Sequence, residues 1–556
     1  MNRKSIAVPA ALFLLAIAVY ANSLAHDFVW DDLAVIRDNS FLDSPGAWWR
    51  CFGRDFGMEL VHRRPAGYYR PLVTLSFVLN HAGAKQRPFA YHWVNVLLHG
   101  LNTVLVFWLV ARLVNRRTGA FAAGLFAAHP IHAESVAFIA GRSDLLCATF
   151  LLLSLRATLR SFESRRKERA VWRTIAMGCY AGALLSKEAA IALPVVLIGY
   201  SLIQRHRWRS VVRLCAPATI VALAYVVFRL RFFPPAGFAE MESLPLGGLV
   251  KHSGRLLSFY AAQQVFPFIP TLGAETLTRR PIVDVAAVVL LILLLRIARP
   301  WRRAAIAALW VAAFLAPVFW VNLFTGVAVN DRFAYIPSIG ACALAALTAA
   351  QFWDHHRLSR LAVGVVVVVF VSLFASYSIV YSWMWRDSVT LWRAAAEYHP
   401  RCGVARYNLA WAYYDDVGNM SGAVQAMSEA AQRFSDRDLQ ADTYANLARF
   451  LAEAGEDDRA VEAARRGLAL KSDPTGYRRW LARFLSQLGR HGEAVIELEA
   501  VQKAVPDNSG VCLELAREYL ALEGPEKERA RQWYLRAREL GAARDEGIEK
   551  ALGNGK

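Results

Sequence analysis

The sequence has few of the motifs that identify soluble enzymes and metal proteins. Its seven cysteines form no Cys-x-x-Cys pair and no Cys/His ligand spacing, which argues against a disulfide framework and a zinc site. Neither the GxGxxG pattern nor the Walker A pattern occurs, so the chain has no signature of a nucleotide site. We therefore expect no cofactor and no bound divalent metal.

Charged residues are also scarce within the long apolar runs that precede residue 388 and dense after it. Hydrophobic residues make up 56% of the 556 residues, too large a share for a soluble protein of this charge content. This pattern predicts an all-α protein with a polytopic membrane domain over 1–387 and a soluble helical domain over 388–556. Lys and Arg (64) outnumber Asp and Glu (45). The basic residues stand in short clusters between apolar runs, which excludes a nucleic-acid partner in favour of membrane topology.

Eleven apolar segments are candidates for membrane-spanning helices, which need about 20 residues each. They cover residues 5–22, 93–113, 119–137, 145–160, 171–186, 189–204, 211–230, 282–297, 304–321, 335–352 and 361–382. The first resembles a signal peptide, but no convincing cleavage site precedes His26 and many spans follow, so we expect it to be retained.

Basic residues indicate how these spans are oriented. With the N-terminus in the cytoplasm, every strong basic cluster without acidic partners falls on the inner side, as the positive-inside rule requires. The outer side then receives two long loops, 23–92 and 231–281, and the C-terminal domain. Within the second loop, Arg255 to Phe266 is too short for a span and is expected to form an interfacial or re-entrant helix. Trp48 and Trp49 are expected to mark an interfacial helix in the first loop.

The C-terminal region contains an internal repeat. Leucines followed by alanine recur at Leu409, Leu447, Leu481 and Leu515, with spacings of 38, 34 and 34 residues. A small residue recurs in the second helix of each unit, at Ala423, Ala460, Ala494 and Ala530. This pattern resembles the tetratricopeptide repeat, in which small residues let paired helices pack closely. We expect about four repeats in an α-solenoid, preceded by a half-repeat from Trp392 to Pro400.

Ionisable residues beside the spans are costly, so each is a functional hypothesis. In the predicted topology they gather on the outer side, where a lipid head group lies. They are Asp31 and Asp32 after the first span, His129, His132, Glu134, Arg142 and Asp144 around the third, Lys187 and Glu188 between the fifth and sixth, and Asp331 and Arg332 before the tenth.

This combination suits sugar transfer from a lipid-phosphate donor. A carboxylate deprotonates the acceptor hydroxyl, and Lys and Arg offset the charge on the leaving phosphate. Several structural alternatives stay open. Asp31 and Asp32 also suit the end of a span, Lys187 an ion pair with Glu188, and Arg142 a pair with Asp144 that leaves only Arg332 for phosphate. His129 and His132 share a helix face that suits either a metal or hydrogen bonds within the bundle.

Seven motifs resemble those of a known family. They are FVWDD (28–32), YYRPL (68–72), HWVNVLLH (92–99), HPIHAES (129–135), GRSDLL (141–146), SKE (186–188) and DRFAYIPSIG (331–340). Together with the C-terminal repeats, they are similar to the transmembrane-and-tetratricopeptide-repeat (TMTC-type) proteins. That resemblance implies a GT-C fold and protein O-mannosyltransferase activity with a polyprenyl-phosphate mannose donor.

The resemblance also implies roles for individual residues. Asp31 and Asp32 hold the position of the catalytic acid, and His132, Glu134, Arg142, Asp144, Lys187, Glu188 and Arg332 line the site. The repeats present or bind acceptor polypeptide. We therefore expect an inverting, metal-independent membrane glycosyltransferase that acts on Ser/Thr hydroxyls of extracytoplasmic protein, with Arg142, Lys187 and Arg332 as phosphate ligands. The alternatives are the same fold acting on a lipid-linked glycan or cell-wall polymer, and a membrane-anchored repeat scaffold without activity.

Overall fold

The computed structural model shows an all-helical chain. It describes residues 3–56, 67–234, 246–268, 270–272, 281–325, 329–354, 357–522 and 526–553, and these residues contain no strand. The chain divides into two compact units, Met1–His399 and Pro400–Lys556. Helix α16 (Ser388–Tyr398), which the sequence suggests as a half-repeat, is part of the first unit.

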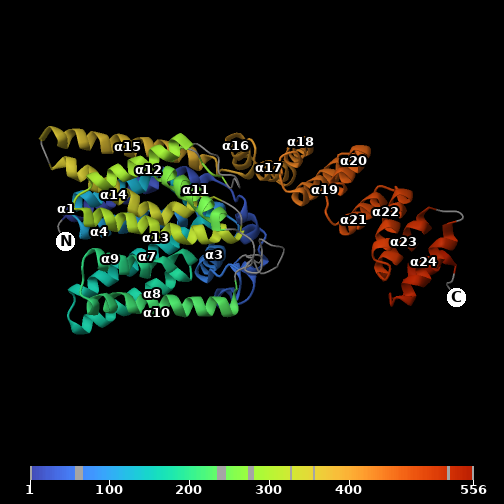
Figure 1. Ribbon diagram of the computed structural model, residues 1–556, viewed down its shortest axis with the longest axis horizontal. Coiled ribbons are helices and arrows are strands. Elements are labelled where there is room, and N and C mark those ends of the chain that lie inside the picture. The colour runs from blue at the N-terminus through green and yellow to red at the C-terminus, as the bar shows by residue number, and fades with distance from the viewer. Residues whose placement is uncertain are drawn as a thin grey trace. The chain divides into compact units, whose positions relative to one another are not determined.

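The first unit is a bundle of long, roughly parallel helices (Figure 1). Proline opens α3 and α4, where its missing N–H costs nothing, and the Asn115 side chain caps α5 by accepting from the Thr118 backbone N–H. The helices are α1 (Arg3–Tyr20), α2 (Ala47–Arg50), α3 (Pro71–Ala84), α4 (Pro88–Leu113), α5 (Arg116–Ala128), α6 (Ala133–Ala137), α7 (Arg142–Glu163), α8 (Arg166–Leu184), α9 (Leu193–Ile203), α10 (Trp208–Phe232), α11 (Leu246–Val265), α12 (Pro281–Ile297), α13 (Trp301–Thr325), α14 (Tyr335–Trp353), α15 (Arg357–Trp383) and α16.

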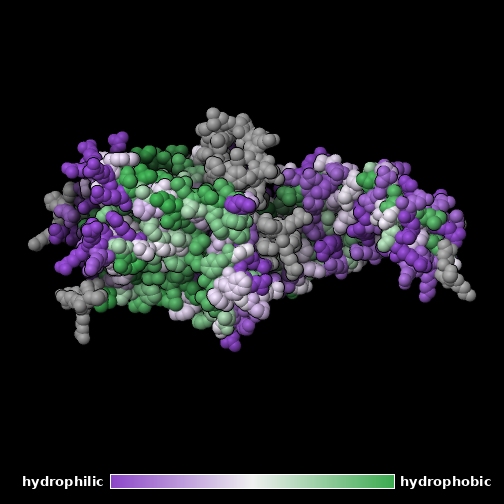
Figure 2. All heavy atoms as spheres, turned by 90° about the horizontal axis from the view of Figure 1, so that it is seen from below, coloured by the Kyte–Doolittle hydropathy of each residue, from purple (hydrophilic) through white to green (hydrophobic). Residues whose placement is uncertain are grey.

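Seven helices among the described residues are long and apolar enough to cross a membrane. They cover Ile6–Ala25, Pro88–Leu113, Ile139–Glu163, Trp208–Phe232, Trp301–Phe319, Asp331–Trp353 and Ser359–Trp383. Figure 2 shows the matching surface, a broad apolar band on the visible face of the first unit with a hydrophilic zone at its end. The chain is therefore a multi-pass membrane protein.

The other four expected spans also contain helices, but each falls short of a full apolar span. Helix α8 carries several charges in its first turns, and α9 and α12 are short. The segment 119–137 is interrupted, because α5 ends at Ala128 and His129 adopts an extended conformation before Pro130. This break turns the chain, so that residues 130–141 form three short helical turns at the end of the bundle.

Helix α11 is longer than the sequence predicts. The expected segment, Arg255 to Phe266, is only the second half of a helix that begins at Leu246. Its Leu256 and Tyr260 are fully buried against Leu315 and Val318 of α13. Packing against α13 therefore stabilises a helix that is too polar in its first half to be recognised as apolar.

The second unit contains paired helices that match the predicted repeats. Its helices are α17 (Gly403–Asp415), α18 (Met420–Ala431), α19 (Arg437–Glu453), α20 (Asp457–Leu468), α21 (Thr475–Gln487), α22 (His491–Ala504), α23 (Ser509–Ala521), α24 (Lys527–Glu539) and α25 (Glu546–Leu552). The four recurring alanines of the second helices, Ala423, Ala460, Ala494 and Ala530, are all fully buried. They allow each helix pair to approach closely, as expected for a repeat solenoid.

Candidate functional site

A cavity of about 190 Å³ lies in the first unit, among the segments that precede α3, α7, α9 and α14. Its lining comes from chain segments that are far apart in the sequence. The ionisable groups that line it are Asp31, Arg70, Lys187, Glu188 and Arg332, together with Tyr68. Three cations and two carboxylates therefore line one cavity. Four of these five residues, all except Arg70, are site residues predicted from the sequence.

Asp31 is the carboxylate that faces this cavity from the FVWDD motif. It is half-buried. Burial raises the pKa of Asp31 above its usual range, while the positive charges of Arg332 and Arg70 oppose that shift. A carboxylate with a raised pKa beside a cavity suits a general base, because its proton affinity approaches that of the group it deprotonates.

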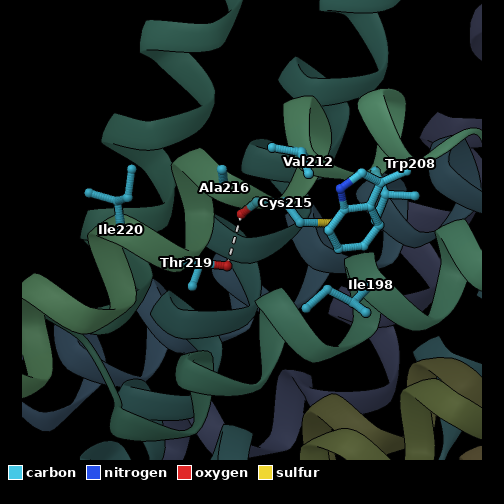
Figure 3. Close-up of a pocket in the computed structure, with 8 residues that line it drawn as sticks. Ile198, Trp208, Val212, Cys215, Ala216, Thr219 and Ile220 are labelled. Carbon is cyan, nitrogen blue, oxygen red and sulfur yellow. Dashed lines mark hydrogen bonds between the residues drawn. The ribbon is translucent and has the colours of Figure 1, made fainter.

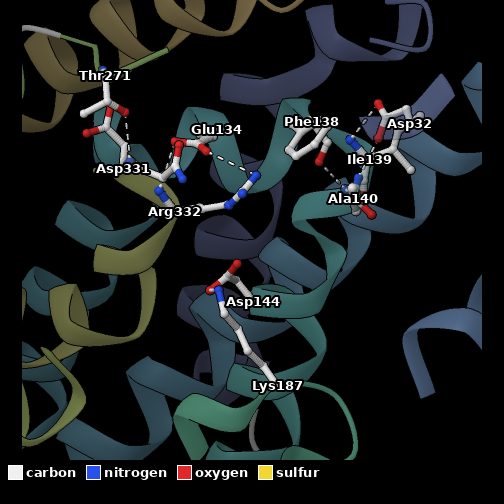
Figure 4. A network of polar contacts seen from close by, with 12 residues as sticks. Asp32, Glu134, Phe138, Ile139, Ala140, Asp144, Lys187, Thr271, Asp331 and Arg332 are labelled. Carbon is white, nitrogen blue, oxygen red and sulfur yellow. Dashed lines mark hydrogen bonds and ion pairs between the residues drawn. The ribbon is translucent and has the colours of Figure 1, made fainter. Parts of the chain in front are cut away.

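Asp32 has a different place, which the sequence leaves open. Its side chain is fully buried and accepts hydrogen bonds from three backbone N–H groups, those of Val29 (3.3 Å), Ile139 (3.3 Å) and Ala140 (2.8 Å). Burial raises the pKa of Asp32 to about 8, and the three N–H groups oppose that shift. Figure 4 shows Asp32 beside the 138–140 turn, to which it ties the FVWDD segment. Asp32 therefore holds the backbone of this segment in place.

Trp30 holds the same segment from the other side. Its φ of 53° lies in the left-handed region, which is strained for a bulky residue and marks a conformation imposed by its surroundings. Its ring stacks on Phe138 at 5.4 Å between centroids. The Arg332 guanidinium lies 5.3 Å from the centroids of both rings, in the geometry of a cation–π contact.

Glu134 orients Arg332 by two contacts (Figure 4). One carboxylate oxygen accepts from the Arg332 backbone N–H at 3.2 Å, and the other lies 3.5 Å from its guanidinium. Glu134 is fully buried; burial raises its pKa and the charge of Arg332 opposes that shift. Removing Arg332 leaves the buried charge of Glu134 uncompensated.

Lys187 is held by Asp144. Its Nζ lies 2.6 Å from one oxygen of that carboxylate, and both side chains are buried. Burial lowers the pKa of Lys187, whereas the Asp144 charge raises it. The second oxygen of Asp144 has no hydrogen-bond partner among the described residues. The sequence left open two other pairs, Lys187 with Glu188 and Arg142 with Asp144. In the structure Asp144 pairs with Lys187 instead, and Glu188 pairs with Arg70.

Arg70 is a site residue for which the sequence motifs predict no role. Its guanidinium makes two hydrogen bonds to Glu188, at 2.6 and 3.2 Å, and lies 4.9 Å from the Tyr68 ring centroid. The available signal was an arginine in the YYRPL motif, immediately before the proline that opens α3. Only the fold shows that this arginine contacts Glu188 of the SKE motif.

Arg142 is not among the residues that line the cavity, which removes it from the phosphate ligands predicted above. Its guanidinium is fully buried and donates to Asn95 Oδ1 (2.8 Å), Asn80 Oδ1 (2.6 Å) and the Tyr91 carbonyl (2.8 Å). These acceptors belong to α3 and α4, so Arg142 fastens α7 to both helices. No charge pattern in the sequence points to uncharged amides as its partners.

His132 also lies outside the cavity lining. Its Nε2 is 2.7 Å from Ser338 Oγ, and its ring packs against Phe126 and Tyr335. His129 Nε2 donates to the Gln264 carbonyl at 3.2 Å. Both histidines therefore join helices. The part of the chain that the structure describes contains no group of three or more His, Cys, Asp or Glu side chains able to hold a metal ion.

Comparisons with known proteins support the sequence resemblance. Residues 72–230 match the family described as dolichyl-phosphate-mannose-protein mannosyltransferase. Protein O-mannosyl-transferase TMTC2 of Mus musculus is 39% identical over 197 residues, 35% of this chain and 24% of the relative. TMTC4 of Homo sapiens is 26% identical over 495 residues, 74% of this chain and 64% of the relative. The similarity to TMTC-type proteins is thereby confirmed.

The chain matches only about a quarter of the length of the relative from Mus musculus. Among solved structures, MamA aligns with 30% of this chain and 84% of its own at a TM-score of 0.23 and 15% identity. One chain of the APC/C hetero-tetramer Cut9–Hcn1 aligns with 82% of this chain and 96% of its own length at a TM-score of 0.22 and 14% identity.

Proposed function

We propose that this chain, which resembles the TMTC-type proteins, is an integral membrane glycosyltransferase of the GT-C type. It transfers a hexose, which we take to be mannose, from a polyprenyl-phosphate donor to Ser/Thr hydroxyls of extracytoplasmic protein. The observation that supports this proposal most strongly is the cavity in which the Asp31 carboxylate faces Arg70, Lys187 and Arg332. Part of the stretch that forms the cavity lies within the match to a mannosyltransferase family.

Asp31 is the proposed base. Its carboxylate accepts the proton of the acceptor hydroxyl as the hydroxyl oxygen bonds to the anomeric carbon. The bond from that carbon to the phosphate oxygen breaks at the same time, on the opposite face of the sugar, so the configuration inverts. The electron pair leaves with the phosphate, which becomes a more highly charged anion.

Arg70, Lys187 and Arg332 are the proposed ligands of that anion. Each of them is already held by a carboxylate, namely Glu188, Asp144 and Glu134 respectively. Such pairs fix the cations before the donor binds, so little reorganisation is needed when negative charge develops. Because three cations surround the leaving group, the reaction as we propose it needs no divalent metal.

The repeat unit is the proposed binding surface for the acceptor polypeptide. Its first helices carry exposed arginines at a constant interval: Arg449, Arg483 and Arg517, each two residues after a buried leucine. Arg449 lies 5.9 Å from the Trp411 ring centroid. A regular row of cations with an aromatic neighbour suits an extended polypeptide with acidic side chains.

The proposed orientation follows from the charges between helices. We place the N-terminus in the cytoplasm, and the cavity and the repeat unit on the extracytoplasmic side. That side supplies both a lipid head group and translocated polypeptide. A site for this reaction must meet both at once.

Transfer to a peptide tests the proposal directly. The purified full chain is incubated with polyprenyl-phosphate mannose or polyprenyl-phosphate glucose and a Ser/Thr-containing acceptor peptide, and the glycopeptide is measured by mass spectrometry. We expect mannosylated peptide from the wild-type chain and from Asp38→Asn, a matched control at an exposed aspartate of the same loop. Asp31→Asn should give none.

Three outcomes contradict the proposal in different ways. Transfer to a lipid-linked glycan but not to peptide assigns the chain to another acceptor. Full transfer by Asp31→Asn removes the base. Absence of transfer from either donor by a folded wild-type chain favours a membrane-anchored repeat scaffold.

A further inference from the structure

A second cavity, of about 260 Å³, opens on the flank of the first unit between α9 and α10 (Figure 3). Its walls are apolar, with Ile198 from α9 and Trp208, Val212 and Ile220 among the residues from α10. The hydroxyl of Thr219, which also lines it, donates to the Cys215 carbonyl of its own helix at 3.0 Å. This groove therefore accommodates a hydrocarbon chain and offers no polar group to a soluble ligand.

A strongly basic rim adjoins the groove. Exposed arginines stand at 205, 207, 209 and 213, and the sequence has no Asp or Glu from Ala189 to Ala239. Arg209 precedes Val212 by three residues, and Arg213 precedes Ala216 by three. This spacing places each arginine one helical turn from a residue that lines the groove.

Two arginines elsewhere between the helices have counter-ions. Arg112 pairs with Glu163, and Arg117 pairs with Asp354 at 2.8 Å. In the described part of the chain, the rim arginines form no ion pair with a carboxylate. Trp208, the first residue of α10, is 74% exposed, as is typical of a side chain in the head-group layer.

We infer that the groove and its rim bind an anionic glycerophospholipid of the surrounding bilayer. One acyl chain lies in the groove, and the phosphodiester rests on Arg209 and Arg213. The charge of the rim selects an anionic head group over a zwitterionic one. The site is distinct from the one proposed for the glycosyl donor, because the two cavities share no lining residue.

Native mass spectrometry of the full chain tests this site. The delipidated protein is titrated with phosphatidylglycerol or phosphatidylcholine of identical acyl chains, and bound lipid is counted. We expect the first phosphatidylglycerol to bind at least tenfold more tightly than phosphatidylcholine. Because a basic residue beside an anionic lipid strengthens binding about fivefold, Arg209→Gln with Arg213→Gln should weaken it by about 30-fold.

Matched variants separate the site from general charge effects. Arg302→Gln with Arg303→Gln removes two basic residues at the start of α13 and should leave the first binding event unchanged. Ala216→Trp fills the groove and should abolish the preference for phosphatidylglycerol, whereas Leu223→Trp, at an exposed position of the same helix, should not. Thermal unfolding of each variant without lipid identifies any that fail to fold.

Several results would overturn the inference. They are equal binding of the two phospholipids to the wild-type chain, an equal loss in the α13 control, and an undiminished preference in a folded Ala216→Trp variant. Displacement of phosphatidylglycerol by equimolar polyprenyl phosphate would instead assign the groove to the donor lipid.

Discussion

Asp31 and Asp32 are adjacent in the sequence but occupy different environments. One lines a cavity that holds three cations, and the other is enclosed by backbone N–H groups. Sequence alone cannot separate them, because nothing in two neighbouring aspartates indicates which will face a hollow. The two side chains diverge immediately after Trp30, whose backbone is left-handed.

Substituting each aspartate by asparagine should therefore have a different effect. Asp31→Asn should abolish transfer with the unfolding temperature unchanged, because the lost group accepts a proton and holds no backbone. Asp32→Asn should lower the free energy of unfolding by about 1–3 kcal/mol, because an amide NH₂ group then meets backbone N–H donors. Thermal unfolding and transfer assays on both variants measure this difference. Equal stability of the two variants would contradict the positioning role of Asp32.

The pKa of Asp31 predicts how transfer depends on pH. A general base must be deprotonated, so kcat/KM should rise with pH, with a midpoint above the usual value for aspartate. Arg332→Gln removes a positive charge that lowers this pKa, so its midpoint should move further up. Initial rates over a pH series in wild type and variant measure both midpoints. An Arg332→Gln midpoint below that of the wild type would exclude Asp31 as the titrating base.

Other residues show why only part of the site could be foreseen. Charge scarcity in apolar helices predicts that Lys187, Glu188 and Arg332 meet, because an isolated charge is costly there. The same rule misplaces Arg142, whose charge is satisfied by two asparagine amides and a carbonyl. It also misses Arg70, which lies in a loop where charge is ordinary. Burial cost reveals that a charged group needs partners but does not identify them.

At the scale of elements, Asp331 joins three helices at the edge of the site. It precedes α14, and its carboxylate accepts from Gln263 of α11 at 2.9 Å and from the Tyr381 hydroxyl of α15. The Thr271 backbone N–H is a further donor, at 3.1 Å. Because Arg332 is the next residue, this junction also fixes the backbone position of a proposed phosphate ligand.

Weakening the junction should affect both stability and activity. Tyr381→Phe removes one donor to a buried carboxylate and should cost about 1–3 kcal/mol of unfolding free energy. It should also lower kcat through Arg332, with little change in the KM for peptide. Tyr377→Phe is the matched control, since Tyr377 donates to the Phe268 carbonyl at 2.5 Å and not to Asp331. An equal loss of kcat in both variants would contradict a specific effect of the Asp331 junction.

Helix positions were predictable and helix ends were not. Apolar length places a helix at all eleven expected ranges. Apolar length alone does not locate the break at Pro130, because it averages the polar residues of HPIHAES with the apolar residues on either side. That break places Glu134 against Arg332 and the 138–140 turn against Asp32. The candidate site therefore lies where the bundle departs from the simplest sequence pattern.

At the scale of the whole molecule, the proposed orientation determines which surfaces meet impermeant reagents. Ser472→Cys places a thiol on an exposed loop of the repeat unit, and Lys167→Cys places one at an exposed position in the first turn of α8. In intact cells we expect the first to react with a membrane-impermeant maleimide and the second to react only after lysis. The native chain is the background control, since six of its seven cysteines are buried and Cys179 is partly so. The opposite labelling pattern would reverse the topology.

The repeat unit and the membrane unit should contribute separately to kinetics if acceptor binding and chemistry are divided between them. Arg479 and Arg483 both contact Glu514 of the next first helix, and Arg517 contacts Asp545. Because these pairs are partly exposed, each contributes little to the free energy of folding. An arginine of such a pair can therefore exchange its carboxylate partner for a carboxylate of a bound polypeptide.

Neutralising the arginine row should therefore change affinity and not chemistry. We expect Arg449→Gln, Arg483→Gln and Arg517→Gln together to raise the KM for a long acidic acceptor at least tenfold, with kcat unchanged and with no effect on a short neutral acceptor. The matched control neutralises Arg459, Arg466 and Arg529, exposed arginines of the second helices that also form ion pairs. Raised salt should weaken the wild-type preference for the acidic acceptor and leave the triple variant unaffected. Equal KM values for row and control variants would mean that the acceptor binds elsewhere, and Asp31 would keep its role, because the two tests measure different parameters.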